Sequence, residues 1–413
     1  MTAGFDRTAD FGTFTYHGGA LEVARRLAPG APEPWIDLST GINPHAYPLP
    51  DLEPDTWSRL PESGALERLE ATAAQRYGVD PARTVAGPGS QALIQALSRI
   101  LQRGAVGALG PTYGGFAAAF AAAGASVVEA KRLEDMNGLD VAIVVNPNNP
   151  DGRIIPRGDL LALHERLAAR GGVLIVDEAF ADFAPLALES TRGPSRRVSS
   201  PLGGEDQGGG SRRPTSHERG ATFASLLDLR DPPPLPAPTR GGGCANVIDS
   251  AEMRQALEPE ESLAPMLPAS GAVVLRSFGK AYGLAGLRLG FALASPDIVP
   301  SLRAALGPWP VSGPAIAIGI GGLADSDWLE KMRARLDQDK ARLDALLREA
   351  GWRIVGGTCL FRLAAHEDAR GAFERLLAAG ILARPFADMP DRLRFGIPGD
   401  ENAWERLAKA LGG

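Results

Sequence analysis

Residues 277–290 read Ser-Phe-Gly-Lys-Ala-Tyr-Gly-Leu-Ala-Gly-Leu-Arg-Leu-Gly and follow a strand-like run at 273–276. The run predicts a strand that delivers Lys280 among small neighbours. A lysine that forms a Schiff base needs little steric cover and a neutral fraction. Arg288, between glycine-bounded leucines, has a planar fork that can bind a phosphate bidentately. The alternative for this stretch alone is a surface lysine in a glycine-rich loop.

The composition limits the kinds of protein that are possible. The chain has 413 residues, 44% hydrophobic and 22% charged, enough for one large α/β domain and a smaller one. A net charge of -6 argues against binding to nucleic acid or to an anionic membrane. Cys244 and Cys359 lie far apart, which suggests neither a disulfide framework nor a metal site. Without a signal peptide or a long apolar segment, the protein is expected to be cytoplasmic.

Three further apolar runs, at 105–109, 140–145 and 172–176, predict short strands, and the segments between them have helical periodicity. Almost fully apolar strands are typical of a mostly parallel sheet that helices cover on both faces. The predicted fold class is therefore α/β. In such sheets ligands bind at the ends of the strands, so the residues that follow the runs are candidates for a site.

Several of these residues have a chemical use. Tyr113 could lie flat on a planar cofactor, or it could belong to the core. The segment Gly89-Ser90-Gln91 opens a helix whose N–H groups could cradle a phosphate, although such a helix start is common. Asp177 ends the last run, where a buried carboxylate is costly without a partner. A protonated pyridine nitrogen would be such a partner.

In this order along the chain, these residues resemble the active site of the fold-type I pyridoxal-phosphate enzymes, the aspartate aminotransferase superfamily. The resemblance implies a large sheet domain, a small α+β domain and pyridoxal 5′-phosphate as the cofactor. It implies that Lys280 carries the cofactor, that Asp177 keeps its ring protonated and that Tyr113 stacks on the ring. The other implied contacts are Asn149 on the ring oxygen and, on the phosphate, Gly89, Ser90, Gln91, Ser277 and Arg288.

Further motifs narrow the resemblance to one group. Residues 16–19, 37–44, 177–180, 308–312 and 392–396 are similar to those of the threonine-phosphate decarboxylases of cobalamin biosynthesis, near relatives of histidinol-phosphate aminotransferases. The resemblance implies decarboxylation of L-threonine O-3-phosphate to (R)-1-amino-2-propanol O-2-phosphate by a homodimer. One alternative is an aminotransferase of the histidinol-phosphate type, and a remote one is a non-enzymatic ligand-binding module.

The same resemblance implies that His17, Asn43, Arg392 and Arg394 bind the substrate. His17 would lie near the substrate's phosphate, whereas without the resemblance a helix cap or packing role is favoured. Arg392 and Arg394 stand two apart on a predicted strand and therefore on one face. Leu393-Arg394 fits the register of a carboxylate-binding arginine better, but the sequence leaves the choice open.

Two positions depart from the pattern of the group. Phe180 stands where the aminotransferases usually have a tyrosine whose hydroxyl bonds the cofactor's ring oxygen, so Asn149 is expected to be the main donor there. Leu60 stands where a tyrosine of the partner subunit is expected. This second departure leaves open how the second subunit completes the phosphate site.

The predicted organisation has an N-terminal arm at 1–44 that forms part of the small domain, a large cofactor-binding domain at 45–305 and a small C-terminal domain at 306–413. A strand is expected at 357–363 in the last of these. Residues 186–257 are rich in Gly, Pro, Ser and Arg and cannot bury enough apolar surface to offset chain entropy. They are predicted to be an insertion without a role in the core.

Overall fold

The computed structural model describes residues 14, 18–101, 104–184 and 260–412. These belong to one compact unit of the chain, Met1–Leu188 with Ser250–Gly413, and a second unit is formed by Glu189–Asp249. The second unit, His17 and the predicted insertion lie outside the described residues. The domain boundaries within the first unit stay a prediction.

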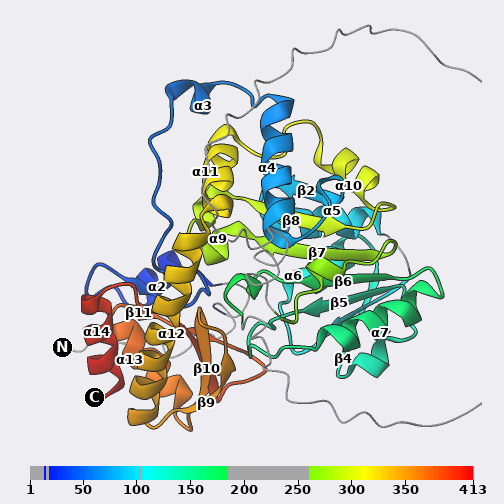
Figure 1. The fold of residues 1–413 in the computed structure, drawn as a ribbon. Helices are drawn as coiled ribbons and strands as arrows, with labels where there is room; N and C mark the ends of the chain where they lie inside the picture. The colour runs from blue at the N-terminus through cyan, green and yellow to red at the C-terminus, as the bar shows by residue number, and fades with distance from the viewer. Residues whose placement is uncertain (1–13, 15–17, 102–103, 185–259, 413) are drawn as a thin grey trace, which may run out of the picture. The chain divides into compact units, whose positions relative to one another are not determined.

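The larger sheet has seven strands in the order β2-β8-β7-β6-β5-β3-β4 (Figure 1). Strands β3 to β7 run parallel, whereas β8 is antiparallel to both of its neighbours, β7 and β2. The mostly parallel α/β fold predicted from the sequence is confirmed, although β8 was not predicted. The strands are β2 Thr84–Gly87, β3 Ala105–Leu109, β4 Ser126–Ala130, β5 Val141–Val145, β6 Val173–Asp177, β7 Ala272–Ser277 and β8 Gly290–Ala294.

Helices cover both faces of this sheet because successive side chains of a buried strand point to opposite sides. Along β5, Ala142 and Val144 belong to the core beneath α4, α7 and α11, whereas Ile143 belongs to the core beneath α5, α6 and α10. The helices are α4 Ser63–Tyr77, α5 Ser90–Ile100, α6 Gly115–Ala122, α7 Arg157–Ala168, α10 Val299–Leu306 and α11 Gly313–Ala324.

A smaller antiparallel sheet, β12-β13-β10-β9, packs with α13 and α14 around a third core. The long helix α12 contributes Leu336 to the core of the larger sheet and Leu343 to this third core, so it belongs to both. The N-terminal arm is attached to this part of the fold by β1, which pairs in parallel with β11. The bounds are α2 Leu21–Leu27, β1 Ile36–Asp37, α12 Ser326–Glu349, β9 Arg353–Gly357, β10 Phe361–Ala365, α13 Ala369–Ala378, β11 Ile381–Leu382, β12 Arg384–Pro385, β13 Arg392–Gly396 and α14 Glu401–Leu411.

One predicted strand is wrong. Instead of a single strand at 357–363, β9 ends at Gly357 and β10 begins at Phe361. The chain turns between them, because the Thr358 N–H donates to the Phe361 carbonyl oxygen at 2.9 Å. The two strands then pair with each other in antiparallel fashion, which the apolar pattern alone did not indicate.

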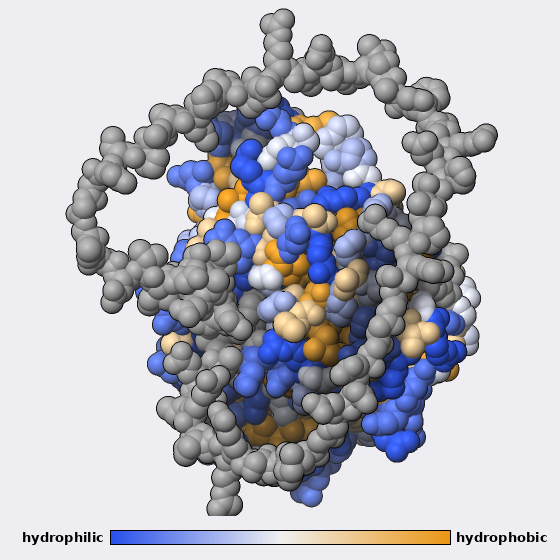
Figure 2. All heavy atoms as spheres, turned by 45° about the vertical axis from the view of Figure 1, so that its right-hand side comes forward, coloured by the Kyte–Doolittle hydropathy of each residue, from blue (hydrophilic) through white to orange (hydrophobic). Residues whose placement is uncertain are grey.

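The cores leave a largely hydrophilic exterior on the face shown in Figure 2, with hydrophobic residues gathered in patches between the polar ones. Large apolar side chains that stay exposed include Leu49, Trp57, Leu60 and Trp309. Trp57 belongs to the short helix α3, Pro54–Ser58, and Trp309 lies in the loop before α11. Within the described residues, no helix is long and apolar enough to span a membrane.

Candidate active site

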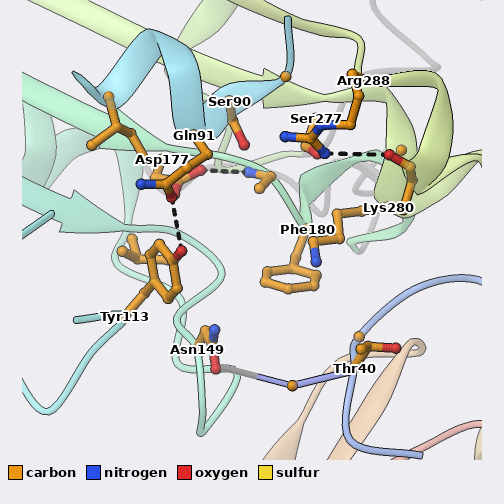
Figure 3. Close-up of a pocket in the computed structure, with 18 of the residues that line it drawn as sticks. Thr40, Ser90, Gln91, Tyr113, Asn149, Asp177, Phe180, Ser277, Lys280 and Arg288 are labelled. Carbon is orange, nitrogen blue, oxygen red and sulfur yellow. Dashed lines mark hydrogen bonds between the residues drawn. The ribbon is translucent and has the colours of Figure 1, made fainter. Parts of the chain in front are cut away.

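A cavity of about 380 Å³ lies at the C-terminal ends of β5, β6 and β7 (Figure 3). The strand ends, the start of α5 and the loop before α6 form one side of it. Gly18, Thr40 and Gly41 of the arm and residues of β12 and β13 form the other. The predicted residues that line it are Gly89, Ser90, Gln91, Tyr113, Asn149, Asp177, Ser277, Lys280, Arg288 and Arg394.

Lys280 reaches this cavity because β7 ends at Ser277 and continues into α9, a single helical turn at Phe278–Ala281. Burial, and next the nearby charge of Arg394, lower the pKa of Lys280 to about 8, although Asp177 opposes the shift. Its Nζ lies 5.7 Å from the centroid of the Phe180 ring. Near neutral pH the amine therefore has the neutral fraction that a nucleophile needs.

Asp177 is the last residue of β6 and is almost fully buried. Burial raises the pKa of Asp177 to about 6 despite the hydrogen bond from the Ala179 N–H and the charge of Lys280, which both lower it. Its Oδ1 accepts the Ala179 N–H at 3.0 Å. A cationic ring nitrogen beside this carboxylate would hold it ionised, so the group fits a pyridinium ring.

A candidate anion-binding corner lies between the start of α5 and Arg288. Gly89 has φ of +84°, and a Cβ there would lie 2.7 Å from Arg288 Nη2, so only glycine allows the guanidinium this close to the start of α5. Arg288 Nη1 donates to the Ala285 carbonyl oxygen at 3.2 Å. The N-terminus of an eleven-residue helix and a guanidinium are suited to an anion.

Tyr113 is held in place by Gln91. The Tyr113 hydroxyl donates to Gln91 Oε1 at 2.8 Å, and Figure 3 draws this bond as the dashed line between the labelled Tyr113 and Gln91. The sequence indicated the backbone of Gln91 as a phosphate contact but not this use of its side chain. The bond orients the ring at the edge of the cavity, where a planar cofactor could stack on it.

Asn149 and Arg394 form a buried pair at the opposite end. Arg394 Nη1 donates to Asn149 Oδ1 at 2.6 Å, and Nη2 donates to the Ser39 carbonyl oxygen at 2.6 Å. Because Asn149 Oδ1 accepts this bond, its Nδ2 is the group that can donate to a cofactor oxygen. Burial, with the neighbouring charge of Arg384, lowers the pKa of Arg394 well below its ordinary value.

Arg384 lines the cavity and was not predicted from the sequence. It pairs with Arg394 across β12 and β13, and its burial lowers its pKa. A bound anion would offset the cost of bringing two buried guanidinium groups together. Nothing local in the sequence marks Arg384, because the long-range pairing of β12 with β13 is what brings it to the site.

Two predicted substrate residues do not line the cavity. Asn43 is buried against the end of α9, where its Nδ2 donates to the Ala281 carbonyl oxygen at 2.8 Å. The Arg392 side chain is about one-third exposed, and its Nε lies 3.6 Å from Asp391 Oδ1. His17 lies outside the described residues, but the next residue, Gly18, borders the cavity.

Together these groups fit the pyridoxal phosphate expected from the sequence. A buried carboxylate, an amine of lowered pKa and an anion corner are placed around one cavity. Among the described residues, no cluster of three or more His, Cys, Asp or Glu side chains could hold a metal ion.

The sequence matches the family Aminotransferase class I and II over residues 33–195 and 245–411. The chain belongs to this family. It is 36% identical to a threonine-phosphate decarboxylase of Pseudomonas aeruginosa, with 96% of each chain covered. It is also 35% identical to one of Sinorhizobium sp, covering 96% of this chain and 97% of the relative.

A solved structure has the same fold. Histidinol-phosphate aminotransferase from Sinorhizobium meliloti, in complex with pyridoxal-5′-phosphate, superposes with a TM-score of 0.66 at 18% identity, covering 100% of this chain and 98% of that one. The match shows that the described sheets and helices adopt the fold-type I arrangement.

Proposed function

We propose that the protein is a pyridoxal-phosphate-dependent decarboxylase that converts L-threonine O-3-phosphate to (R)-1-amino-2-propanol O-2-phosphate, in cobalamin biosynthesis. The observation that carries this proposal is the identity of 35–36% to two threonine-phosphate decarboxylases over 96% of the chain. The charges of the cavity support it independently. Asp177 is the one acidic residue among the described residues that line the cavity, whereas four of them are Lys or Arg.

This imbalance suits a cofactor and a substrate that are both anionic. Arg288 and the start of α5 are assigned to the cofactor's phosphate. Arg394 is assigned to the substrate's α-carboxylate and Arg384 to its second anionic group, because these two buried arginines are neighbours at the other end of the cavity. His17 remains a proposed contact to the substrate's phosphate.

When bound, the cofactor's protonated ring accepts the electron pair that the departing carboxylate leaves behind. Asp177 would face the ring nitrogen as a carboxylate and keep a proton on it. Lys280 would hold the cofactor, and its Nζ of lowered pKa would accept and return a proton at the reacting atoms. Arg394 and Arg384 orient the substrate, and the buried lining excludes water from the reacting bond.

Transamination is the second candidate, because the chain belongs to the family Aminotransferase class I and II. Phe180 favours the decarboxylase only as a departure from the pattern of the aminotransferases, which usually have a tyrosine at this position. The holoenzyme should be incubated separately with L-threonine phosphate and with histidinol phosphate plus a keto acid. Phosphorus NMR should show aminopropanol phosphate from the first, and transfer of the amino group from histidinol phosphate to the keto acid in the second, giving the corresponding amino acid, would instead support the aminotransferase.

We also propose a homodimer in the cytoplasm. Trp57, Leu60 and Trp309 expose 57–68% of their surface, an unusual amount for large apolar residues on one chain. A second copy would cover such residues, and Leu60 then lies where the partner's tyrosine is expected in the family. Light scattering should give twice the chain mass, and Trp57→Lys should reduce it to that of one chain.

A further inference from the structure

The short helix that carries Lys280 cannot hold its own position. α9 is a single turn, Phe278–Ala281, and isolated turns of helix are unstable because helix nucleation is unfavourable. The carbonyl groups at its C-terminal end also lack partners within the helix. Other parts of the chain must therefore fix the Lys280 backbone.

Residues 43–47, here named the arm clamp, supply these partners. The Asn43 N–H donates to the Lys280 carbonyl oxygen at 3.0 Å, and Asn43 Nδ2 donates to that of Ala281 at 2.8 Å. The Tyr47 N–H donates to the Tyr282 carbonyl oxygen at 2.8 Å. One segment thus bonds three consecutive carbonyl groups at the end of α9.

The orientation of the Asn43 amide is fixed from both sides. Its Oδ1 accepts the His45 N–H at 2.9 Å, so Nδ2 is the end that faces Ala281. The two backbones also meet directly, since Gly283 has φ of +66° and a Cβ there would lie 2.6 Å from the Asn43 carbonyl oxygen. Both polar atoms of the Asn43 side chain therefore form hydrogen bonds with backbone groups outside the cavity.

The other side of the arm clamp is attached to α12. His45 Nε2 lies 2.8 Å from Asp339 Oδ2, and the Tyr47 hydroxyl donates to Asp325 Oδ2 at 3.2 Å. The Tyr47 ring also meets the Trp328 ring edge-on, with centroids 5.1 Å apart. Because α12 is long and belongs to two cores, the arm clamp connects α9 to a rigid element.

We propose that Asn43 is a positioning residue for Lys280, acting through the carbonyl groups of α9. The inference rests on the proposed role of Lys280 as the cofactor lysine, but not on the identity of the substrate. Reacting groups must be held closely, and a displacement of about 1 Å can cost about 10²-fold in rate. Without the Asn43 side-chain bond to Ala281, only the backbone N–H groups of the arm clamp hold the end of α9, so Lys280 is fixed less tightly and Nζ is less often at the reacting atoms.

The variant Asn43→Ala, as holoenzyme, tests this role. Its kcat should fall about ten-fold or more, while the KM for L-threonine phosphate changes by less than about two-fold. The pH at which the visible absorption of the Lys280-bound cofactor changes should shift. Hydrogen exchange of the backbone amides at 278–283 should become faster.

Ser295→Ala is the matched control. The buried Ser295 Oγ accepts the Ala272 N–H at 3.1 Å, so this variant loses a similar side-chain-to-backbone bond at the start of β7, the strand that leads into α9. It should lower the melting temperature and leave kcat, the absorption and the exchange at 278–283 unchanged. An equal loss of kcat in both variants would mean that Asn43 is only structural and would overturn the proposal.

If Asn43→Ala does not fold, His45→Ala detaches the arm clamp from Asp339 without touching α9 and should give smaller shifts in the same direction. Borohydride reduction of the wild type separates the two proposals. Labelling of a lysine other than Lys280 would contradict the proposed function itself. Labelling of Lys280, with unchanged absorption and exchange in the variant that folds, would overturn the positioning role alone.

Discussion

The two ends of the cavity are built from different parts of the fold. At the cofactor end, Asp177 and Lys280 follow neighbouring strands of the seven-stranded sheet. At the substrate end, Arg384 and Arg394 come from the four-stranded sheet, and the arm closes the wall. The first end has a buried carboxylate for a cationic ring, and the second has two buried arginines for an anionic substrate. This difference predicts that variants at the cofactor end lower kcat, whereas variants at the substrate end weaken substrate binding.

The largest effect is expected at the cofactor end. Lys280→Ala should lower turnover by about 10³-fold or more, because it removes both covalent attachment and the group that moves the proton. The measurement is the rate of product formation together with borohydride labelling, which should mark Lys280 in the wild type and nothing in the variant. Substantial turnover by the variant would contradict the assignment.

Asp177→Asn should retain the cofactor yet lower kcat by about 10²-fold or more, since removing one partner of a buried ion pair costs about 3–5 kcal/mol. The anion is needed when the ring accepts electrons more than when it binds. Cofactor content by absorbance and kcat should be measured on the same sample. A kcat close to that of the wild type would remove Asp177 from the proposed chemistry.

Changes at the substrate end should act mainly on binding. Arg394→Ala or Arg384→Ala should lower kcat/KM by about 10 to 100-fold, because charge-assisted hydrogen bonds are worth about 1.5–3 kcal/mol each. Arg392→Ala is the matched control on the same strand as Arg394 and should stay within about two-fold. If Arg392→Ala caused the larger loss, the assignment of the substrate end would be reversed.

The smallest effect is expected outside the cavity, for the segment 186–257. Ala184 and Glu260 line one small cavity, so the described ends that flank the segment are close together. Shortening the connection from about 72 to about 5 residues lowers the free-energy cost of closing the loop by about 2.4 kcal/mol. A Gly-Ser linker should leave activity unchanged and raise the melting temperature slightly. Loss of turnover in a folded deletion variant that binds the cofactor would contradict this expectation.

The cofactor end could be predicted because each residue there follows a local pattern. Apolar runs predict the strands. Asp177 ends β6, and Tyr113 and Lys280 lie a few residues after the ends of β3 and β7. Parallel strands bring such residues to one edge without further information. The structure does place these side chains around one cavity, and their chemical roles stay predictions.

The substrate end depends on contacts between distant parts of the chain. Arg384 enters the cavity through its pairing with Arg394, and Asn43 is drawn to the end of α9 rather than to the cavity. The local spacing of residues predicts neither of these placements. Arg392 and Arg394, for example, stand on the same face of one strand, yet Arg394 is buried and Arg392 is about one-third exposed. Spacing predicts a shared face, whereas neighbouring elements decide which residue is enclosed.

The most direct test of the account is the release of carbon dioxide from L-threonine O-3-phosphate labelled in its carboxyl carbon. The holoenzyme should release labelled carbon dioxide in a one-to-one ratio with aminopropanol phosphate, without any keto acid, and Lys280→Ala should release none above background. A labelled carboxyl that is retained in a keto-acid product, with the cofactor converted to its pyridoxamine form, would show transamination and contradict the proposed decarboxylation.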